Sequence, residues 1–177
     1  AYAVVLQHPI GRADTAEAAS MRRTLEAVDA AGLAGVIIYP NSDPGHAGII
    51  REIGRWQLKT GWRVFRSLPR ESFLRLACHA AVMVGNSSSG IIESASLGVR
   101  AVNIGPRQEG RLRCGPSVVD VPDRPEAIRA AVRRAMATPR PVRAACVYGD
   151  GRAGHRIAAI LRRLKITPSL RRKHLTY

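Results

Sequence analysis

Short, mostly apolar segments alternate along the chain with longer segments of helical periodicity. The apolar segments are rich in valine and isoleucine and lack polar alternation, which is typical of parallel strands buried on both faces. Because crossovers between parallel strands are right-handed, the alternation predicts a doubly wound, Rossmann-like α/β domain with a parallel sheet of about six strands. The expected strands are residues 2–6, 35–39, 62–65, 81–84, 101–104 and 118–121.

Helices are expected between these strands, at residues 15–31, 44–57, 70–79, 123–137 and 152–164, with a further helix that ends at Leu97. We expect Asp14 or Thr15 to cap the first helix. Asp43 is expected to cap the second, with Pro44 at its first helical position. Residues 1–167 are interpreted as one domain and residues 168–177 as a basic tail.

The composition predicts a globular protein in a reducing compartment. The 177 residues are 46% hydrophobic, which is enough for one domain with a core. There is no membrane-length apolar stretch and no secretory leader, so we expect a cytoplasmic protein without a membrane partner. Cys78, Cys114 and Cys146 are far apart and odd in number, so neither a disulfide framework nor a zinc cluster is expected. No other metal and no cofactor is expected either. The chain opens at Ala1 rather than Met, as a fragment of a longer chain would.

The net charge of +15 raises the question of a nucleic-acid partner. The basic residues are mostly arginines scattered along the chain rather than gathered in one stripe. Aromatic residues make up only 5%, and no nucleic-acid-binding motif is present. We therefore expect no specific nucleic-acid partner, and a nucleic-acid-binding module remains as an alternative of another class.

A loop of small residues, Gly-Asn-Ser-Ser-Ser-Gly at 85–90, follows the strand 81–84 and opens a helix. Ligands of parallel sheets bind beyond the carboxyl ends of the strands, and free N–H groups at a helix N-terminus suit a phosphate. The hydroxyls of Ser87 and Ser88 add donors. Glu93 lies one helical turn further on, where its carboxylate could accept the two hydroxyls of a ribose. The alternative is an ordinary serine-capped helix with a solvated Glu93.

Three further residues stand at the carboxyl ends of expected strands. His8 follows the first strand, Asn41 follows the second, and Arg107 follows the fifth on a glycine-flanked loop. An arginine at such a position can bind a phosphate through two hydrogen bonds. The alternatives are that His8 is structural, that Asn41 belongs to a polar turn, and that Arg107 is simply one arginine among many.

Together these segments resemble the C-terminal half of the UDP-N-acetylglucosamine 2-epimerase family. The resemblance rests on Gly-Asn-Ser-Ser-Ser-Gly-Ile-Ile-Glu at 85–93, Ser-Leu-Gly at 96–98 and Asn-Ile-Gly-Pro-Arg-Gln-Glu-Gly-Arg at 103–111. Gln-His-Pro at 7–9, the segment 40–45 and Tyr-Gly-Asp-Gly at 148–151 match as well. It covers essentially the whole chain.

The resemblance implies one Rossmann-like half of a two-domain enzyme of glycosyltransferase-B type, with the nucleotide sugar in the cleft between the halves. It implies that Ser87 and Ser88 bind the diphosphate of UDP and that Glu93 binds the ribose. It places His8 and Arg107 beside the diphosphate as catalytic residues. It also implies two further UDP contacts, Asn41 in the cleft and the backbone at Leu68 against the uracil.

The family's reaction is anti elimination of UDP to give 2-acetamidoglucal. A hydrolysing branch then adds water and releases N-acetylmannosamine, whereas a non-hydrolysing branch adds UDP back to the inverted sugar. The two loops resemble the hydrolysing branch, which serves sialic acid pathways, and the non-hydrolysing epimerase is the alternative. A domain that binds a nucleotide sugar without turnover is a further alternative.

The family's acid and base carboxylates lie in the N-terminal domain, which this sequence does not contain. The chain alone is therefore expected to be inactive, with the missing domain and a UDP-sugar as its partners. A homodimer is also expected from the resemblance.

Overall fold

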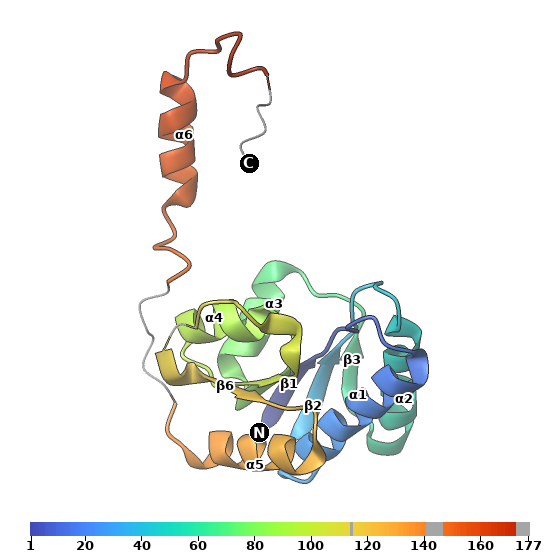
Figure 1. Ribbon diagram of the computed structural model, residues 1–177. Coiled ribbons are helices and arrows are strands. Elements are labelled where there is room, and N and C mark those ends of the chain that lie inside the picture. The colour runs from blue at the N-terminus through green and yellow to red at the C-terminus, as the bar shows by residue number, and fades with distance from the viewer. Residues whose placement is uncertain (114, 141–146, 173–177) are drawn as a thin grey trace. The chain divides into compact units, whose positions relative to one another are not determined.

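The computed structural model describes residues 1–113, 115–140 and 147–172, and its sheet has the strand order β3-β2-β1-β4-β5-β6. Every neighbouring pair of strands in this sheet is parallel. The predicted doubly wound sheet is therefore confirmed (Figure 1). The strands are β1 (Tyr2–Leu6), β2 (Ala34–Ile38), β3 (Arg63–Phe65), β4 (Val82–Gly85), β5 (Ala101–Ile104) and β6 (Val118–Val121).

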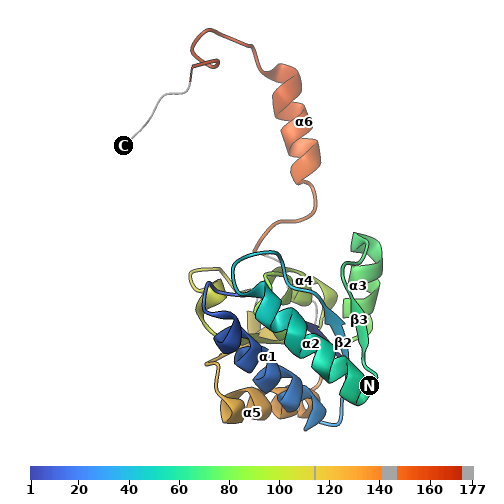
Figure 2. The ribbon, with the colours of Figure 1, turned by 90° about the vertical axis from the view of Figure 1, so that its right-hand side faces the viewer.

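Helices cover both faces of this sheet. On one face α1 packs against both α2 and α5, and on the other α3 packs against α4 (Figures 1 and 2). These helices are α1 (Asp14–Asp29), α2 (His46–Thr60), α3 (Arg70–His79), α4 (Ser89–Leu97) and α5 (Pro125–Ala137). A further helix, α6 (Ala153–Arg163), belongs to a separate unit of the chain.

The sheet separates two buried apolar clusters. Val5 of β1 belongs to the cluster that contains Leu25 of α1 and Ile128 of α5. Val4 belongs to the cluster that contains Ala77 of α3. Successive side chains of a strand point to opposite faces, so one uninterrupted apolar strand supplies both cores.

The carboxyl ends of β1 and β4 form the switch point of the sheet. From β1 the chain continues into α1, and from β4 it continues into α4 on the opposite face. The last paired residues are Leu6 and Gly85. Gly85 has φ +139°, and a Cβ there would lie 2.1 Å from the carbonyl oxygen of Leu6, so this approach requires glycine. Where two neighbouring loops diverge in this way, a crevice forms beyond the strand ends.

The predicted cap of the first helix is wrong. The helix α1 begins at Asp14 with Ala13 at its N-cap, and neither Asp14 nor Thr15 makes a side-chain capping bond.

The predicted start of the second helix is wrong as well. The helix α2 begins at His46, after Gly45 at its N-cap, so Asp43 does not cap it and Pro44 is not its first residue. Gly45 has φ +95°, and a Cβ there would lie 2.8 Å from the carbonyl oxygen of Arg12. Packing against the start of α1 therefore sets where α2 begins.

Contacts divide the chain into two units, Ala1–Val147 and Tyr148–Tyr177. In the second unit, Asp150 accepts the N–H of Arg152 at 3.0 Å and pairs with Arg156 at 2.7 Å. The apolar residues of α6 are exposed. The functional boundary predicted at residue 167 stays a prediction, and residues 173–177 of the predicted tail lie outside the described part. Within the described part, no helix is long and apolar enough to span a membrane.

Candidate functional site

Asn86 connects the three loops that leave β1, β4 and β5. Its Oδ1 accepts the N–H of His8 at 2.6 Å, and its Nδ2 donates to the carbonyl of His8 at 2.8 Å. Its own carbonyl accepts hydrogen bonds from Gln108 Nε2 at 2.8 Å and from an Arg107 guanidinium nitrogen at 3.3 Å. Residues far apart in the sequence are thereby brought together beyond the carboxyl ends of β1, β4 and β5.

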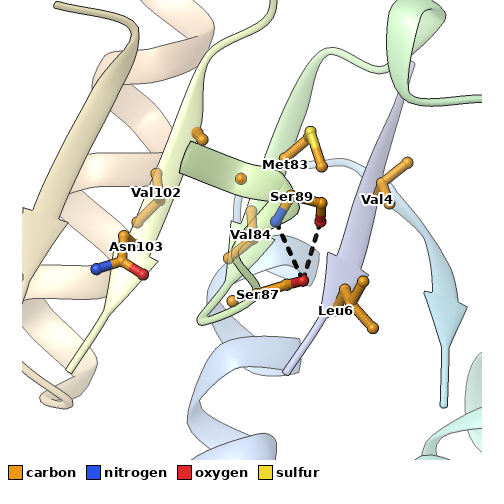
Figure 3. A pocket seen from close by; sticks show the side chains of 11 residues that line it. Val4, Leu6, Met83, Val84, Ser87, Ser89, Val102 and Asn103 are labelled. Carbon is orange, nitrogen blue, oxygen red and sulfur yellow. Dashed lines mark hydrogen bonds between the residues drawn. The ribbon is translucent and has the colours of Figure 1, made fainter. Parts of the chain in front are cut away.

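The small-residue loop presents hydroxyl and backbone donors at the start of α4. Figure 3 shows Ser87 and Ser89 beside the carboxyl end of β1, with Ser87 Oγ accepting from Ser89 N at 3.4 Å and from Ser89 Oγ at 3.0 Å. Since this oxygen is the acceptor in both contacts, the Ser87 hydroxyl proton can be donated to a ligand. Ser88 forms the N-cap of α4. The partial positive charge of a helix N-terminus favours an anion here.

His8 is held as a neutral imidazole. The backbone N–H of Asn41 donates to His8 Nδ1 at 3.0 Å, so the proton of the neutral ring is on Nε2. Burial and the positive charge of Arg107 lower the pKa of His8 from 6.5 to about 4, although Asp43 opposes this shift. At neutral pH the ring therefore offers an uncharged N–H donor.

The loop before α1 is fixed by a buried carboxylate. Glu17 accepts the backbone N–H of Ile10 at 2.9 Å and of Arg12 at 3.2 Å, and its side chain is only 1% exposed. Burial alone would raise the pKa of Glu17, but the hydrogen bonds from Arg12 and Ile10 outweigh it and lower the pKa. This network holds the chain immediately after His8.

Two hollows adjoin these groups. The first, of about 350 Å³, brings together four of the predicted site residues, His8, Asn41, Leu68 and Ser87. The second, of about 510 Å³, is lined by Arg107 together with Pro9, Ile10, Gly11, Asp43, Pro44 and Pro106. Both hollows are wide open to solvent rather than enclosed. Ser88 and Glu93 line neither hollow.

Two predicted ligand contacts have protein partners in this structure. The Asn41 side-chain amide, which the sequence leaves free for a ligand, donates to a carboxylate oxygen of Asp43. Glu93 lies 3.5 Å from an Arg70 guanidinium nitrogen, and its side chain is 21% exposed. A ligand at either residue would therefore exchange an existing partner.

Asn86, Gln108 and Glu17 are parts of the site for which sequence reasoning found no role. Gln108 is 1% exposed and Asn86 is 5% exposed, as buried polar residues with specific partners are. The sequence signal that could have identified Asn86 and Gln108 as site residues is their place within the two loop motifs. Among the described residues, no group of three or more His, Cys, Asp or Glu side chains could hold a metal ion.

A parallel sheet of this order is a doubly wound α/β domain, the class of fold in which ligands bind beyond the carboxyl ends of the strands. The sequence profile described as UDP-N-acetylglucosamine 2-epimerase matches residues 1–162. The chain belongs to this family, and the resemblance found in the sequence is confirmed.

Relatives and solved structures agree with this assignment. The chain is 31% identical over 175 residues to the UDP-N,N'-diacetylbacillosamine 2-epimerase (hydrolyzing) of Legionella pneumophila, covering 98% of this chain and 46% of that protein. It is 35% identical over 122 residues to the UDP-N-acetylglucosamine 2-epimerase of Neisseria meningitidis, covering 67% of this chain and 31% of that protein.

The fold matches that of the Methanocaldococcus jannaschii UDP-GlcNAc 2-epimerase, solved in complex with UDP-GlcNAc and UDP. The TM-score is 0.69 at 18% identity, with 92% of this chain and 45% of that chain covered. The chain thus spans less than half the length of these proteins.

Proposed function

We propose that this chain is the UDP-binding half of a hydrolysing UDP-N-acetylglucosamine 2-epimerase. The observation that carries the proposal is the convergence of the serine loop, His8 and Arg107 on Asn86 at the switch point. Its donors are of the kinds that bind a diphosphate: a helix N-terminus, a hydroxyl, a neutral imidazole N–H and a guanidinium. The UDP-sugar named for the solved relative has this chemistry.

In the proposed reaction, UDP leaves C1 of the sugar while a base removes the proton from C2. The C–H electron pair becomes the C1–C2 double bond, and the C1–O electron pair leaves with UDP. Negative charge then grows on the diphosphate, where Ser87, the N-terminus of α4, His8 Nε2–H and Arg107 would stabilise it. Water afterwards adds across the double bond with the inverted configuration at C2 and gives N-acetylmannosamine.

The remaining contacts proposed for the nucleotide are those that the family resemblance implies. Leu68 lines the hollow that also contains His8 and Ser87, which suits a uracil beside the diphosphate. Glu93 lies one turn into α4, where it would accept the ribose hydroxyls in exchange for Arg70. Asn41 would contact the substrate after release from Asp43.

The base for C2 is proposed to come from outside this chain. Around the described crevice, Asp43 receives a hydrogen bond from Asn41, and Glu93 faces Arg70 on the assigned ribose side. Both carboxylates are therefore paired with groups of this chain rather than free to act as a base. Because the relatives are more than twice as long as the matched segment, we place the base in the half of those proteins that this chain does not cover.

The hydrolysing branch is favoured by the Asn-Ser-Ser-Ser-Gly and Arg-Gln-Glu-Gly-Arg loops and by the printed name of the Legionella relative. The alternatives are a non-hydrolysing epimerase and a domain that binds without turnover. A cytoplasmic location, a sialic acid pathway and a homodimer stay predictions.

Product analysis tests the division of labour. The chain alone, incubated with UDP-N-acetylglucosamine, should release neither UDP nor N-acetylmannosamine at an enzymatic rate, because a positioned base contributes about 10²–10⁴-fold. Joined to an N-terminal domain from a relative, it should release both, and His8→Ala should impair that activity strongly. Ordinary turnover by the chain alone would contradict the proposal, and UDP-ManNAc as the only product would favour the non-hydrolysing branch.

A further inference from the structure

We propose that Asn86 is a positioning residue, whose side-chain amide continues the pairing of β1 with β4 beyond the sheet and holds His8 in the crevice. The backbone pairing ends where the Asn86 N–H donates to the carbonyl of Leu6 at 3.2 Å. The next two bonds to the β1 chain come from the side chain, to the N–H and the carbonyl of His8. The inference rests on the proposed function only for the identity of the ligand.

The fold explains why a side chain takes over at this point. Beyond Leu6 and Gly85 the two chains turn toward helices on opposite faces, so their backbones can no longer pair. A primary amide has one acceptor and one donor side by side, which matches the carbonyl and N–H of a backbone partner. Aspartate has no donor for the His8 carbonyl, and alanine has neither group, so both would leave a part-buried backbone group unpaired.

The same residue also connects the β5 loop. Its carbonyl accepts from Gln108 and Arg107, which follow Ile104 and Gly105. One residue at 5% exposure thus fixes the positions of the serine loop, the imidazole and the guanidinium. In this assignment Asn86 acts through His8 and Arg107 and does not itself touch the ligand.

Hydrogen exchange of the His8 amide in the unsubstituted chain tests the bond without any substitution. The amide lies beyond the end of β1, but its acceptor is a buried side chain, so it should exchange about as slowly as the neighbouring strand amides. Exchange at the rate of an open loop would overturn the proposal.

Asn86→Ala tests the consequence for the site, with Asn103→Ala as the matched control. Asn103 is also a buried asparagine at a strand end, but its amide donates to Asp120 and not to His8. The readouts are the His8 ring pKa by NMR and UDP affinity by calorimetry. The charged groups that face His8, Arg107 and Asp43, are unchanged in both variants.

In Asn86→Ala the pKa of His8 should rise from about 4 toward 6.5, because the ring leaves its buried position. UDP affinity should fall about ten- to hundredfold. Asn103→Ala should change neither readout. An Asn86→Ala variant that keeps both the His8 pKa and the UDP affinity of the unsubstituted chain would overturn the proposal.

The outcomes separate this inference from the proposed function. If the unsubstituted chain binds no UDP, the proposed function fails, while His8 exchange and the His8 pKa still decide the role of Asn86. If Asn86→Ala does not fold, slow exchange in the unsubstituted chain supports the inference and fast exchange overturns it.

Discussion

At the scale of single residues, the protonation of His8 is set by its surroundings. Asn41 N–H donates to Nδ1, and burial and Arg107 disfavour a second proton on the ring. The proposed leaving-group contact is therefore a neutral N–H donor rather than an imidazolium. Such a donor keeps its function over the whole neutral pH range, because the ring titrates only at about pH 4.

This shift has a stability consequence whose sign is fixed. The folded-state pKa of about 4 lies below the ordinary value of 6.5, so the unfolded chain takes up the proton first as the pH falls. The His8 contribution to the free energy of unfolding should decline from about pH 6.5 to about pH 4. The free energy of unfolding in urea is measured for the unsubstituted chain and for His8→Asn across this pH range. The difference between the two separates the His8 contribution from that of the carboxylates, which both chains share. A difference between the two that does not change with pH would contradict the assigned state of His8.

At the scale of secondary-structure elements, local pattern predicts the strands and helices well but not their caps. Short runs rich in β-branched residues identify β1 to β6, although Arg63, Asn103 and Asp120 interrupt three of them. The predicted start of α2 is wrong because Gly45 packs against the backbone of Arg12. These two residues are 33 positions apart, so the sequence around Gly45 does not reveal the contact.

The same reasoning applies to the site. The proposed ligand-binding residues His8, Asn41, Ser87 and Arg107 follow strands of the sheet, where the switch-point rule expects a ligand. The pairing of Asn86 with His8 spans 78 positions, so it becomes visible only once β1 and β4 are neighbours.

The close approach of β1 and β4 predicts that Gly85→Ala destabilises the fold. The new Cβ would lie 2.1 Å from the Leu6 carbonyl oxygen, at a φ that disfavours other residues. We expect a loss of about 1–3 kcal/mol or more in the free energy of unfolding, measured by urea titration. Gly54→Ala in α2 is the control, because a Cβ there meets no atom within 4 Å and alanine favours a helix. Equal stability of the two variants would argue against the close contact between Gly85 and Leu6.

At the scale of the whole molecule, the charge of +15 is spread rather than concentrated. Several arginines pair with acids: Arg12 with Glu17, Arg22 with Glu52 and Arg23 with Asp123. We therefore expect any binding of duplex DNA to be weak, independent of sequence and steeply salt-dependent in fluorescence anisotropy titrations. A sequence-selective complex that survives physiological salt would support the nucleic-acid-binding alternative instead.

Calorimetry of UDP binding to the 177-residue chain tests whether the switch-point crevice is a UDP site. We expect saturation at one site per chain, with Glu93→Ala weaker by about 1–3 kcal/mol because the ribose hydroxyls lose their acceptor. No binding by the unsubstituted chain would contradict the assignment of the switch-point crevice to UDP. Equal affinity for the two chains would contradict the placement of the ribose at Glu93.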